Sequence, residues 1–133
     1  MKNRLITLLS LSLFFLLFGC SNKENSLNKK LNELSNNLNK DVPIQFDDHT
    51  LFIGSEVDAD NTFKYLYQII NIDDIEAMME EVEAQTKANI KDAFELNPDL
   101  KIFTVNNVSV DYVYQDSLGQ VIRTIHITPE DYK

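Results

Sequence analysis

The spacing of apolar residues changes twice along this chain, and those changes limit the folds that it can adopt. Between residues 51 and 69, and again between 108 and 127, apolar residues alternate with polar or small ones, as in β-strands with one buried face. Turn-forming residues interrupt both stretches, at 58–61 and at 116–119. We therefore predict two β-hairpins. The alternating residues are Leu51, Ile53, Val57, Phe63, Tyr65, Tyr67 and Ile69 in the first, and Val108, Val110, Tyr112, Tyr114, Val121, Ile125 and Ile127 in the second.

Between the hairpins the apolar residues lie three or four positions apart, which predicts a helix. Asp73 with Glu76 predicts a capped start, and Asn97-Pro98 predicts the end. Its apolar face would consist of Ile75, Met78, Met79, Val82, Ile90, Ala93 and Phe94.

A narrower apolar stripe precedes the first hairpin, in a segment rich in Asn, Ser and Lys. It consists of Leu27, Leu31, Leu34 and Leu38 and predicts a short helix. We expect this helix to pack on its own domain, and a small coiled coil with a partner or a disordered tether are the alternatives.

The elements follow the order α-β-β-α-β-β, so we predict an α+β fold. The two hairpins would form a four-stranded antiparallel sheet with the central helix packed on one face. The row of Phe63, Tyr65 and Tyr67 and the row of Val110, Tyr112 and Tyr114 would face the helix. The opposite face would carry Lys64, Gln68, Ser109, Asp111, Thr124, His126 and Thr128.

Two residues depart from simple alternation. Arg123 would point inward if alternation continued from Ile125, which predicts a bulge near the turn or a guanidinium that reaches the rim of the sheet. Gly54 lies in the middle of a predicted strand, where a bulge or close packing explains a glycine.

The start of the chain is typical of a bacterial lipoprotein signal. Lys2 and Arg4 precede the uncharged residues 5–18, and the small residue Gly19 permits cleavage before Cys20, the single cysteine. The apolar stretch is shorter than the roughly 20 residues that span a bilayer. We expect Cys20 to carry acyl chains, palmitate among them, and an uncleaved anchor with an inert thiol is the alternative. The residue directly after Cys20 is Ser21 and not aspartate, which favours the periplasmic side of the outer membrane over the inner membrane as the location.

These boundaries divide the chain into three parts. They are a signal peptide at 1–19, a lipidated N-terminus with a tether and short helix at 20–40, and a single α+β domain at 41–133. Cleavage would leave 114 of the 133 residues and remove two basic residues and no acid, so the net charge would change from −9 to −11. Such an acidic surface repels phosphate, so we expect no nucleic-acid partner and a membrane contact through the lipid alone.

No residue pattern indicates catalysis, a cofactor or a metal. His49 and His126 lack the spacing of a zinc site, and no serine lies in a strained glycine turn. Asp58 and Asp60 predict an ordinary hairpin turn, with a calcium loop as the alternative. These two carboxylates also supply the enzyme alternative, a hydrolase, but neighbouring turn acids show no sign of a proton donor with a raised pKa.

Two surfaces are candidates for binding. The acidic residues Glu76, Glu80, Glu81 and Glu83 of the central helix would form either a patch for a cationic partner or a solvated helix face. The tyrosine rows would form either core or a ligand groove.

Several short segments resemble a family of known architecture. They are Asn39 to Pro43, Asn61 to Phe63 with Tyr65 and Tyr67, Asn97 to Asp99, Val108 to Val110 with Tyr112 and Tyr114, Asp116 to Gly119, and Thr128 to Asp131. Residues 39–132 resemble a group of small, functionally uncharacterised exported bacterial proteins, many of them lipoproteins, with one helix between two hairpins. The resemblance implies this fold and export, and it implies no activity.

The resemblance also implies a contact between the helix end and the chain end. Members of that group often carry cysteines at the two positions that Phe94 and Tyr132 occupy here, which looks like a disulfide. We hypothesise that an aromatic contact replaces the crosslink in this chain.

We therefore expect a membrane-anchored, non-enzymatic protein of the bacterial envelope that binds or assists another envelope protein. A sheet edge, an aromatic groove or the acidic helix would provide the surface. Pilotin-like help to an outer-membrane assembly is one such role, and phage-type exclusion is another. A periplasmic protein that binds a small ligand or a cation is the alternative, and a carboxylate-dependent hydrolase is a further one.

Overall fold

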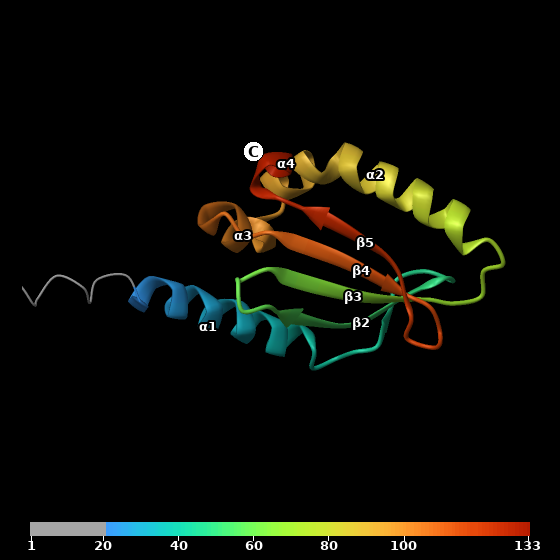
Figure 1. Ribbon diagram of the computed structural model, residues 1–133, viewed down its shortest axis with the longest axis horizontal. Helices are drawn as coiled ribbons and strands as arrows, with labels where there is room; N and C mark the ends of the chain where they lie inside the picture. Colours follow the sequence, from blue (N-terminus) through green and yellow to red (C-terminus); the bar gives the residue numbers. More distant parts are fainter. Residues whose placement is uncertain (1–20) are drawn as a thin grey trace, which may run out of the picture.

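The computed structural model describes residues 21–133, with side chains from residue 26 onward. Figure 1 shows a sheet flanked by helices. The helices are α1 (Ser21–Leu38), α2 (Ile75–Leu96), the 3₁₀ helix η1 (Pro98–Leu100), α3 (Lys101–Asn106) and α4 (Pro129–Tyr132). The strands are β1 (Ile44–Gln45), β2 (Thr50–Val57), β3 (Phe63–Ile69), β4 (Val110–Gln115) and β5 (Val121–Ile127).

The sheet confirms the α+β class but corrects the predicted topology. Its strands follow the order β1-β2-β3-β4-β5, with one strand more than predicted. The hairpins β2–β3 and β4–β5 are antiparallel as predicted, whereas β3 and β4, which join the two hairpins, run parallel. The prediction of a fully antiparallel sheet is therefore wrong. The connection through α2 and α3 brings the chain back to the end of the sheet where β3 begins, so β4 runs in the same direction as β3.

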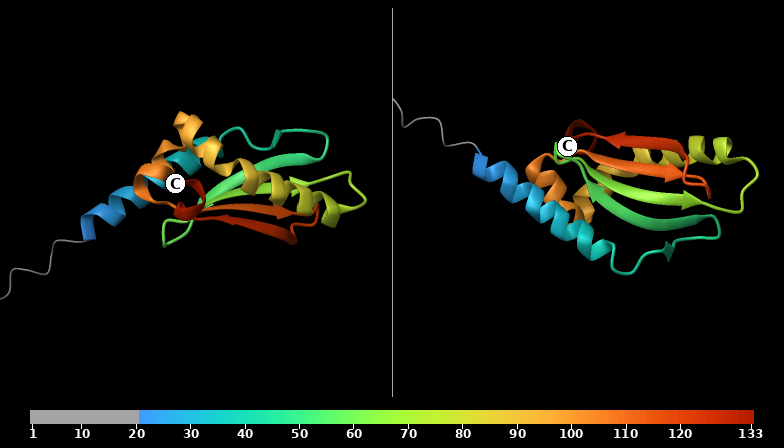
Figure 2. Two further views of the ribbon diagram at one scale, coloured as in Figure 1. Left: turned by 90° about the horizontal axis from the view of Figure 1, so that it is seen from above. Right: turned by 60° about the horizontal axis from the view of Figure 1, so that its bottom comes forward.

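The described helices cover one face of the sheet. Ser55, Tyr65, Tyr112 and Ile125 are cross-strand neighbours on this inner face. The ring of Phe103 in α3 lies 5.1 Å from that of Phe63, and α2 crosses the strands on the same side (Figure 2). The core therefore lies between one sheet face and one layer of helices.

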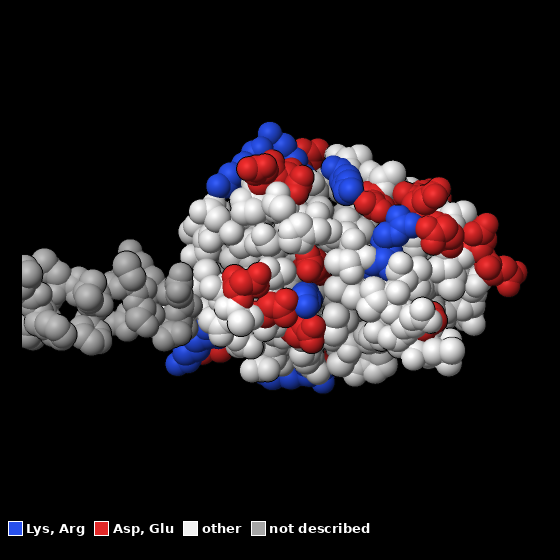
Figure 3. Space-filling model, viewed as in Figure 1, with Lys and Arg blue, Asp and Glu red and all other residues white. Residues whose placement is uncertain are grey.

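The outer face of the sheet carries a row of charged residues. Glu56, Lys64, Asp111 and His126 are direct neighbours across four strands. The Nζ atom of Lys64 lies 3.7 Å from Glu56 and 2.9 Å from Asp58, and His126 pairs with Asp111. Figure 3 shows charged side chains that meet near the middle of this face. This confirms the predicted outward orientation of Lys64, Asp111 and His126.

Helix α1 packs on the domain, as predicted. Leu31 is fully buried, and Leu27, Leu34 and Leu38 pack against the same core. Beside them, Ser35 Oγ donates a hydrogen bond to the carbonyl of Ser55, at 2.8 Å. The leucine stripe is therefore occupied by contacts within the chain.

The side chain of Asn39 pairs with the edge of β2 as a neighbouring strand would. Its Oδ1 accepts from the N–H of Ser55 at 2.7 Å, and its Nδ2 donates to the carbonyl of Ser55 at 2.9 Å. The register of β2 shifts between Phe52 and Gly54, as expected for a bulge. A Cβ at Gly54 would meet Asn39 Oδ1 at 3.4 Å, and its φ of +156° favours glycine.

Helix α2 matches the predicted central helix except at its first residue. Asp74 caps the helix by accepting from the N–H of Ala77 at 3.0 Å, so the predicted role of Asp73 as the cap is wrong. The end at Leu96 agrees with the Asn97-Pro98 signal. The short helices η1, α3 and α4 were not expected, because each is too brief to show a helical period.

Arg123 points inward at a bulge, in agreement with the sequence. Tyr114 pairs with Arg123 and Gln115 pairs with Val121, which leaves Ile122 as the extra residue. The guanidinium reaches α2, where Nη1 lies 2.7 Å from Glu83 and Nη2 pairs with Glu76. The bulge therefore joins the sheet to the first half of α2.

Candidate functional site

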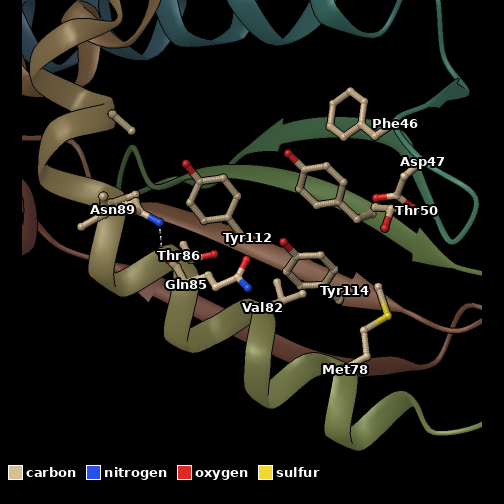
Figure 4. Close-up of a pocket in the computed structure, with 13 residues that line it drawn as sticks. Phe46, Asp47, Thr50, Met78, Val82, Gln85, Thr86, Asn89, Tyr112 and Tyr114 are labelled. Carbon is tan, nitrogen blue, oxygen red and sulfur yellow. Dashed lines mark hydrogen bonds between the residues drawn. The ribbon is translucent and has the colours of Figure 1, made fainter.

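An open groove of about 460 Å³ separates the middle of α2 from the inner face of the sheet. We call it the tyrosine groove. Figure 4 shows Tyr112 and Tyr114 on the sheet, facing residues of α2 across the space. The residues that line it are Phe46, Asp47, Thr50, Tyr67, Met78, Val82, Gln85, Thr86, Asn89, Ile90, Ala93, Tyr112 and Tyr114.

Tyrosine rings form the floor of the groove because strand register places them side by side. Tyr67 of β3 is the direct partner of Tyr114 of β4, and their rings stack with centroids 5.1 Å apart. The ring of Tyr112 lies 6.4 Å from that of Tyr67 and 5.5 Å from that of Tyr65. Stacked rings on neighbouring strands give the groove a flat, apolar and rigid floor.

The wall formed by α2 is polar where it faces these rings. Gln85, Thr86 and Asn89 line the groove between the apolar positions Val82 and Ile90. Helix α2 is attached to the rest of the domain on either side of this stretch. Its first half pairs with Arg123, and Phe94 near its end is buried. The middle of α2 therefore stands away from the sheet and leaves the groove open.

The tyrosine hydroxyls of the floor are free to donate hydrogen bonds. Within residues 26–133, the hydroxyls of Tyr67, Tyr112 and Tyr114 make no hydrogen bond to another side chain or to the backbone. Burial raises the pKa of Tyr114 to about 12, and burial with the neighbouring Tyr114 raises that of Tyr112 to about 12. Burial raises the pKa of Tyr67 as well. These hydroxyls are therefore protonated at neutral pH and available to a ligand.

One end of the groove is formed by the loop between β1 and β2. Phe46 is 60% exposed, and its ring lies 5.8 Å from that of Tyr67. Beside it, Asp47 Oδ1 accepts from the N–H of His49 at 2.7 Å, which fixes the orientation of this carboxylate. Phe46 thus adds an exposed aromatic ring to the groove, and aromatic residues are enriched at protein interfaces.

The four predicted glutamates of α2 do not form one free acidic patch. Glu76 and Glu83 pair with Arg123, and Glu83 also lies 2.6 Å from Lys87. The hydrogen bonds from Lys87 and Arg123 lower the pKa of Glu83. Glu81 Oε1 accepts from Gln85 of the groove wall at 2.9 Å, and Glu80 is exposed. Of the four, Glu81 is thus the one with a contact to a groove residue.

Asp58 and Asp60 lie in the turn between β2 and β3. The amide of Asn61 donates to the carbonyl of Asp58, and Asp60 Oδ1 accepts from the N–H of Thr62 at 3.0 Å. That N–H lowers the pKa of Asp60. Asp58 through its backbone carbonyl and Asp60 through its carboxylate therefore support the hairpin turn that the sequence predicts, while the carboxylate of Asp58 pairs with Lys64.

The histidines lie in separate environments. His49 Nδ1 is 3.3 Å from the carbonyl oxygen of Ile70, while His126 pairs with Asp111 on the outer face. Among the described residues, no three His, Cys, Asp or Glu side chains are grouped closely enough to hold a metal ion. Cys20 lies outside the described residues. No described helix has the length and apolar character needed to cross a membrane.

The sequence prediction missed the wall and the end of the groove. The sequence predicts the tyrosine rows to be either core or a groove, but it indicates no role for Phe46, Gln85, Thr86 and Asn89. The available signal was the gap in the apolar face of α2, where polar residues occupy positions that should contact the sheet between Val82 and Ile90.

Comparison with protein families and solved structures gives matches to the fold. A family model described as Domain of unknown function (DUF8479) matches residues 25–122. No protein with a curated description matches the chain. A Pseudomonas aeruginosa protein described as secreted is 14% identical with a TM-score of 0.66, and the alignment covers 85% of this chain and 98% of that one.

Two pilotins of type II secretion systems share the fold as well. EpsS from Vibrio vulnificus is 11% identical with a TM-score of 0.61, and the alignment covers 83% of this chain and 94% of EpsS. AspS from Vibrio cholerae is 13% identical with a TM-score of 0.55, covering 81% of this chain and 94% of AspS. At these identities the likeness concerns the fold alone.

Proposed function

The chain belongs to the family described as Domain of unknown function (DUF8479), and we propose that it is a lipid-anchored, non-enzymatic envelope protein that assists another envelope protein. The tyrosine groove would bind a short apolar segment of that partner. The family membership agrees with the resemblance to small uncharacterised proteins noted in the sequence, while export and the lipid anchor belong to the proposal.

The chemistry of the tyrosine groove is the observation on which this function rests. Its floor offers flat aromatic surface, and Tyr67, Tyr112 and Tyr114 keep hydroxyls without a partner within the described part of the chain. Apolar side chains of a peptide would lie on the rings. The polar groups of its backbone would meet the tyrosine hydroxyls and the amides of Gln85 and Asn89.

The fold supports an assembly role in the envelope. Two similar structures are pilotins of type II secretion systems. The predicted signal and Cys20 would place this chain at a membrane facing the periplasm, where such a partner occurs. We favour a pilotin-like role over phage-type exclusion on the basis of these two structures.

The carboxylates weighed for hydrolysis are poor candidates for catalysis. A general acid at neutral pH needs a raised pKa, whereas the N–H of Thr62 lowers the pKa of Asp60. The carboxylate of Asp58 pairs with Lys64 at 2.9 Å and is therefore occupied by a contact within the hairpin. Both groups lie in a hairpin turn and neither lines the tyrosine groove. These observations support a binding function over an enzymatic one.

Site-specific photocrosslinking in intact cells tests this function. A benzophenone amino acid at Thr86 would face the groove, and the same residue at Ala84 would lie on the exposed side of α2. We expect one envelope protein to be captured from Thr86 and not from Ala84. Capture of the same proteins from both positions, or of none from Thr86, would contradict the proposed function.

Blocking the groove provides the matched control. Ala93 lines the groove and is exposed, so Ala93→Trp would fill it, while Ala84→Trp adds the same ring elsewhere on the helix. We expect Ala93→Trp to abolish the crosslink from Thr86 and Ala84→Trp to leave it unchanged.

A small apolar ligand is the second candidate occupant, because about 460 Å³ is within the range of ligand pockets. A bound small molecule and no crosslinked protein would favour it.

A further inference from the structure

We propose that the segment bound in the tyrosine groove is basic as well as apolar, with Lys or Arg beside its apolar side chains. This inference rests on the proposed function and adds the chemistry of the partner. The proposal is based on the charged residues in and beside the groove.

The residues that line the groove include one ionisable carboxylate and no cation. That carboxylate belongs to Asp47, and no Lys or Arg occurs among the lining residues described above. Asp47 is exposed, and the hydrogen bond from the N–H of His49 to Oδ1 leaves its other oxygen available. A cationic side chain at this end of the groove would therefore find an oriented carboxylate.

A second carboxylate borders the α2 side of the groove. Glu81 is one turn before Gln85, and it accepts a hydrogen bond from that wall residue at 2.9 Å. The basic residues near this part of α2 are occupied elsewhere, since Lys87 and Arg123 both pair with Glu83. The negative charge of Glu81 is thus left without a basic partner on the described part of the chain.

The exposed ring of Phe46 favours a cation as well. It lines the groove together with Asp47, and the face of an aromatic ring carries the negative part of the ring quadrupole, which attracts Lys and Arg side chains. The whole chain has a net charge of −9, which accelerates association with a basic partner at low ionic strength. An acidic segment would meet repulsion at Asp47 and at Glu81.

Selection of peptides from a random display library against the purified full chain tests this inference. We expect the selected peptides to combine Lys or Arg with aliphatic or aromatic residues, and to bind less tightly as salt is raised. The double substitution D47N/E81Q should weaken their binding by about fivefold to tenfold, as the loss of two exposed ion pairs predicts. The matched control D48N/E80Q removes the same number of charges from exposed positions that do not line the groove. It should change the binding by less than about twofold.

The outcomes separate this inference from the proposed function. Neutral peptides that lose binding in Ala93→Trp but bind D47N/E81Q as well as the parent would overturn the basic partner and retain the groove. Equal losses in D47N/E81Q and D48N/E80Q would also overturn it, because the effect would then reflect net charge. Peptides whose binding survives Ala93→Trp would overturn the proposed function itself.

Discussion

The rings of Phe94 and Tyr132 stack against each other, with centroids 4.6 Å apart and 14° between their planes. Phe94 is near the end of α2, and Tyr132 is in α4 at the end of the chain. The resemblance placed cysteines of related proteins at these two positions, and the predicted contact between them is confirmed. The hydroxyl of Tyr132 also donates to the carbonyls of Phe103 and Val108, at 3.2 and 3.0 Å. This pair therefore ties α2 and the chain end to the segment before β4.

A disulfide should form in place of this aromatic pair. We expect the variant F94C/Y132C, made with Cys20→Ser, to oxidise within the folded monomer, because stacked side chains bring their backbones near each other. Thiol titration and mass spectrometry under denaturing conditions would measure the bond. The control F94C/K133C uses the neighbouring exposed residue and should oxidise less completely. Free thiols in folded F94C/Y132C would show that the two positions are not suitably placed.

Removal of the Asn39 side chain should destabilise the edge of β2. Asn39→Ala takes away the acceptor for the N–H of Ser55 and the donor to its carbonyl. We expect the free energy of unfolding to fall by about 1–2 kcal/mol, and the exposed edge to promote association. Urea unfolding and light scattering would measure both effects. Asn36→Ala, at an exposed position of α1, is the matched control and should change stability by less than about 0.5 kcal/mol.

Much of the fold could be predicted because burial imposes local periods on the sequence. Alternation located β2 to β5, and it correctly placed Arg123 inward, with a bulge as one of the two arrangements that it allowed. Alternation along a strand does not show whether that strand pairs with its neighbour in parallel or antiparallel. The parallel pairing of β3 with β4 was therefore missed. Strand β1 has two residues and was too short to show alternation.

The binding site was only half predicted for a related reason. A row of alternating aromatics is expected for core and for a groove floor alike, since both are positions on one face of a sheet. The difference depends on how closely the helix approaches. Here Gln85, Thr86 and Asn89 occupy the positions of α2 over the rings. The space between these polar side chains and the rings is open.

The tyrosines should resist ionisation in the folded protein. The chain has five tyrosines, and burial raises the pKa of each of them, to about 12 for Tyr112 and Tyr114. Because the folded pKa values exceed the unfolded value of 10.0, these groups stabilise the fold fully below pH 10.0. That stability is lost as the pH rises toward 12.

Ultraviolet absorbance of phenolate would measure this behaviour. At about pH 10.5 the native protein should show little phenolate, whereas the protein in denaturant should show most of its tyrosines ionised. The variant Tyr132→Phe should alter the native curve little at that pH. Early ionisation of two or more tyrosines in the native protein would show that the tyrosine rings of the groove floor are not protected from water by burial.

Replacement of Cys20 should release the protein from the membrane. We expect Cys20→Ser to move the protein from the membrane fraction to the soluble fraction of the envelope, because the acyl chains provide the attachment. Cell fractionation and mass measurement of the mature N-terminus would test this. Ser21→Ala, at the next position, should leave fractionation between membrane and soluble material unchanged. Identical fractionation and processing of Cys20→Ser and the parent would contradict the lipid anchor.

Loss of Arg123 should change the dependence of stability on pH. Lys87 first, and then Arg123, lower the pKa of Glu83 below its ordinary value of 4.5. A carboxyl group with a depressed pKa stabilises the fold above its unfolded pKa, and this contribution is lost as the pH falls through the folded pKa. Arg123→Met removes one of the two cations, so we expect the variant to be less stable than the parent at neutral pH.

The difference between parent and variant should shrink as the carboxylate of Glu83 becomes protonated, at pH values below the ordinary pKa of glutamate, 4.5. Urea unfolding at several pH values would measure it. Lys91→Met, which removes an exposed lysine of α2, is the matched control. Its free energy of unfolding at acidic pH should stay close to that of the parent. A difference for Arg123→Met that stays constant down to about pH 3 would show that Arg123 stabilises the domain through packing of its aliphatic chain, and that the ion pairs to α2 contribute little.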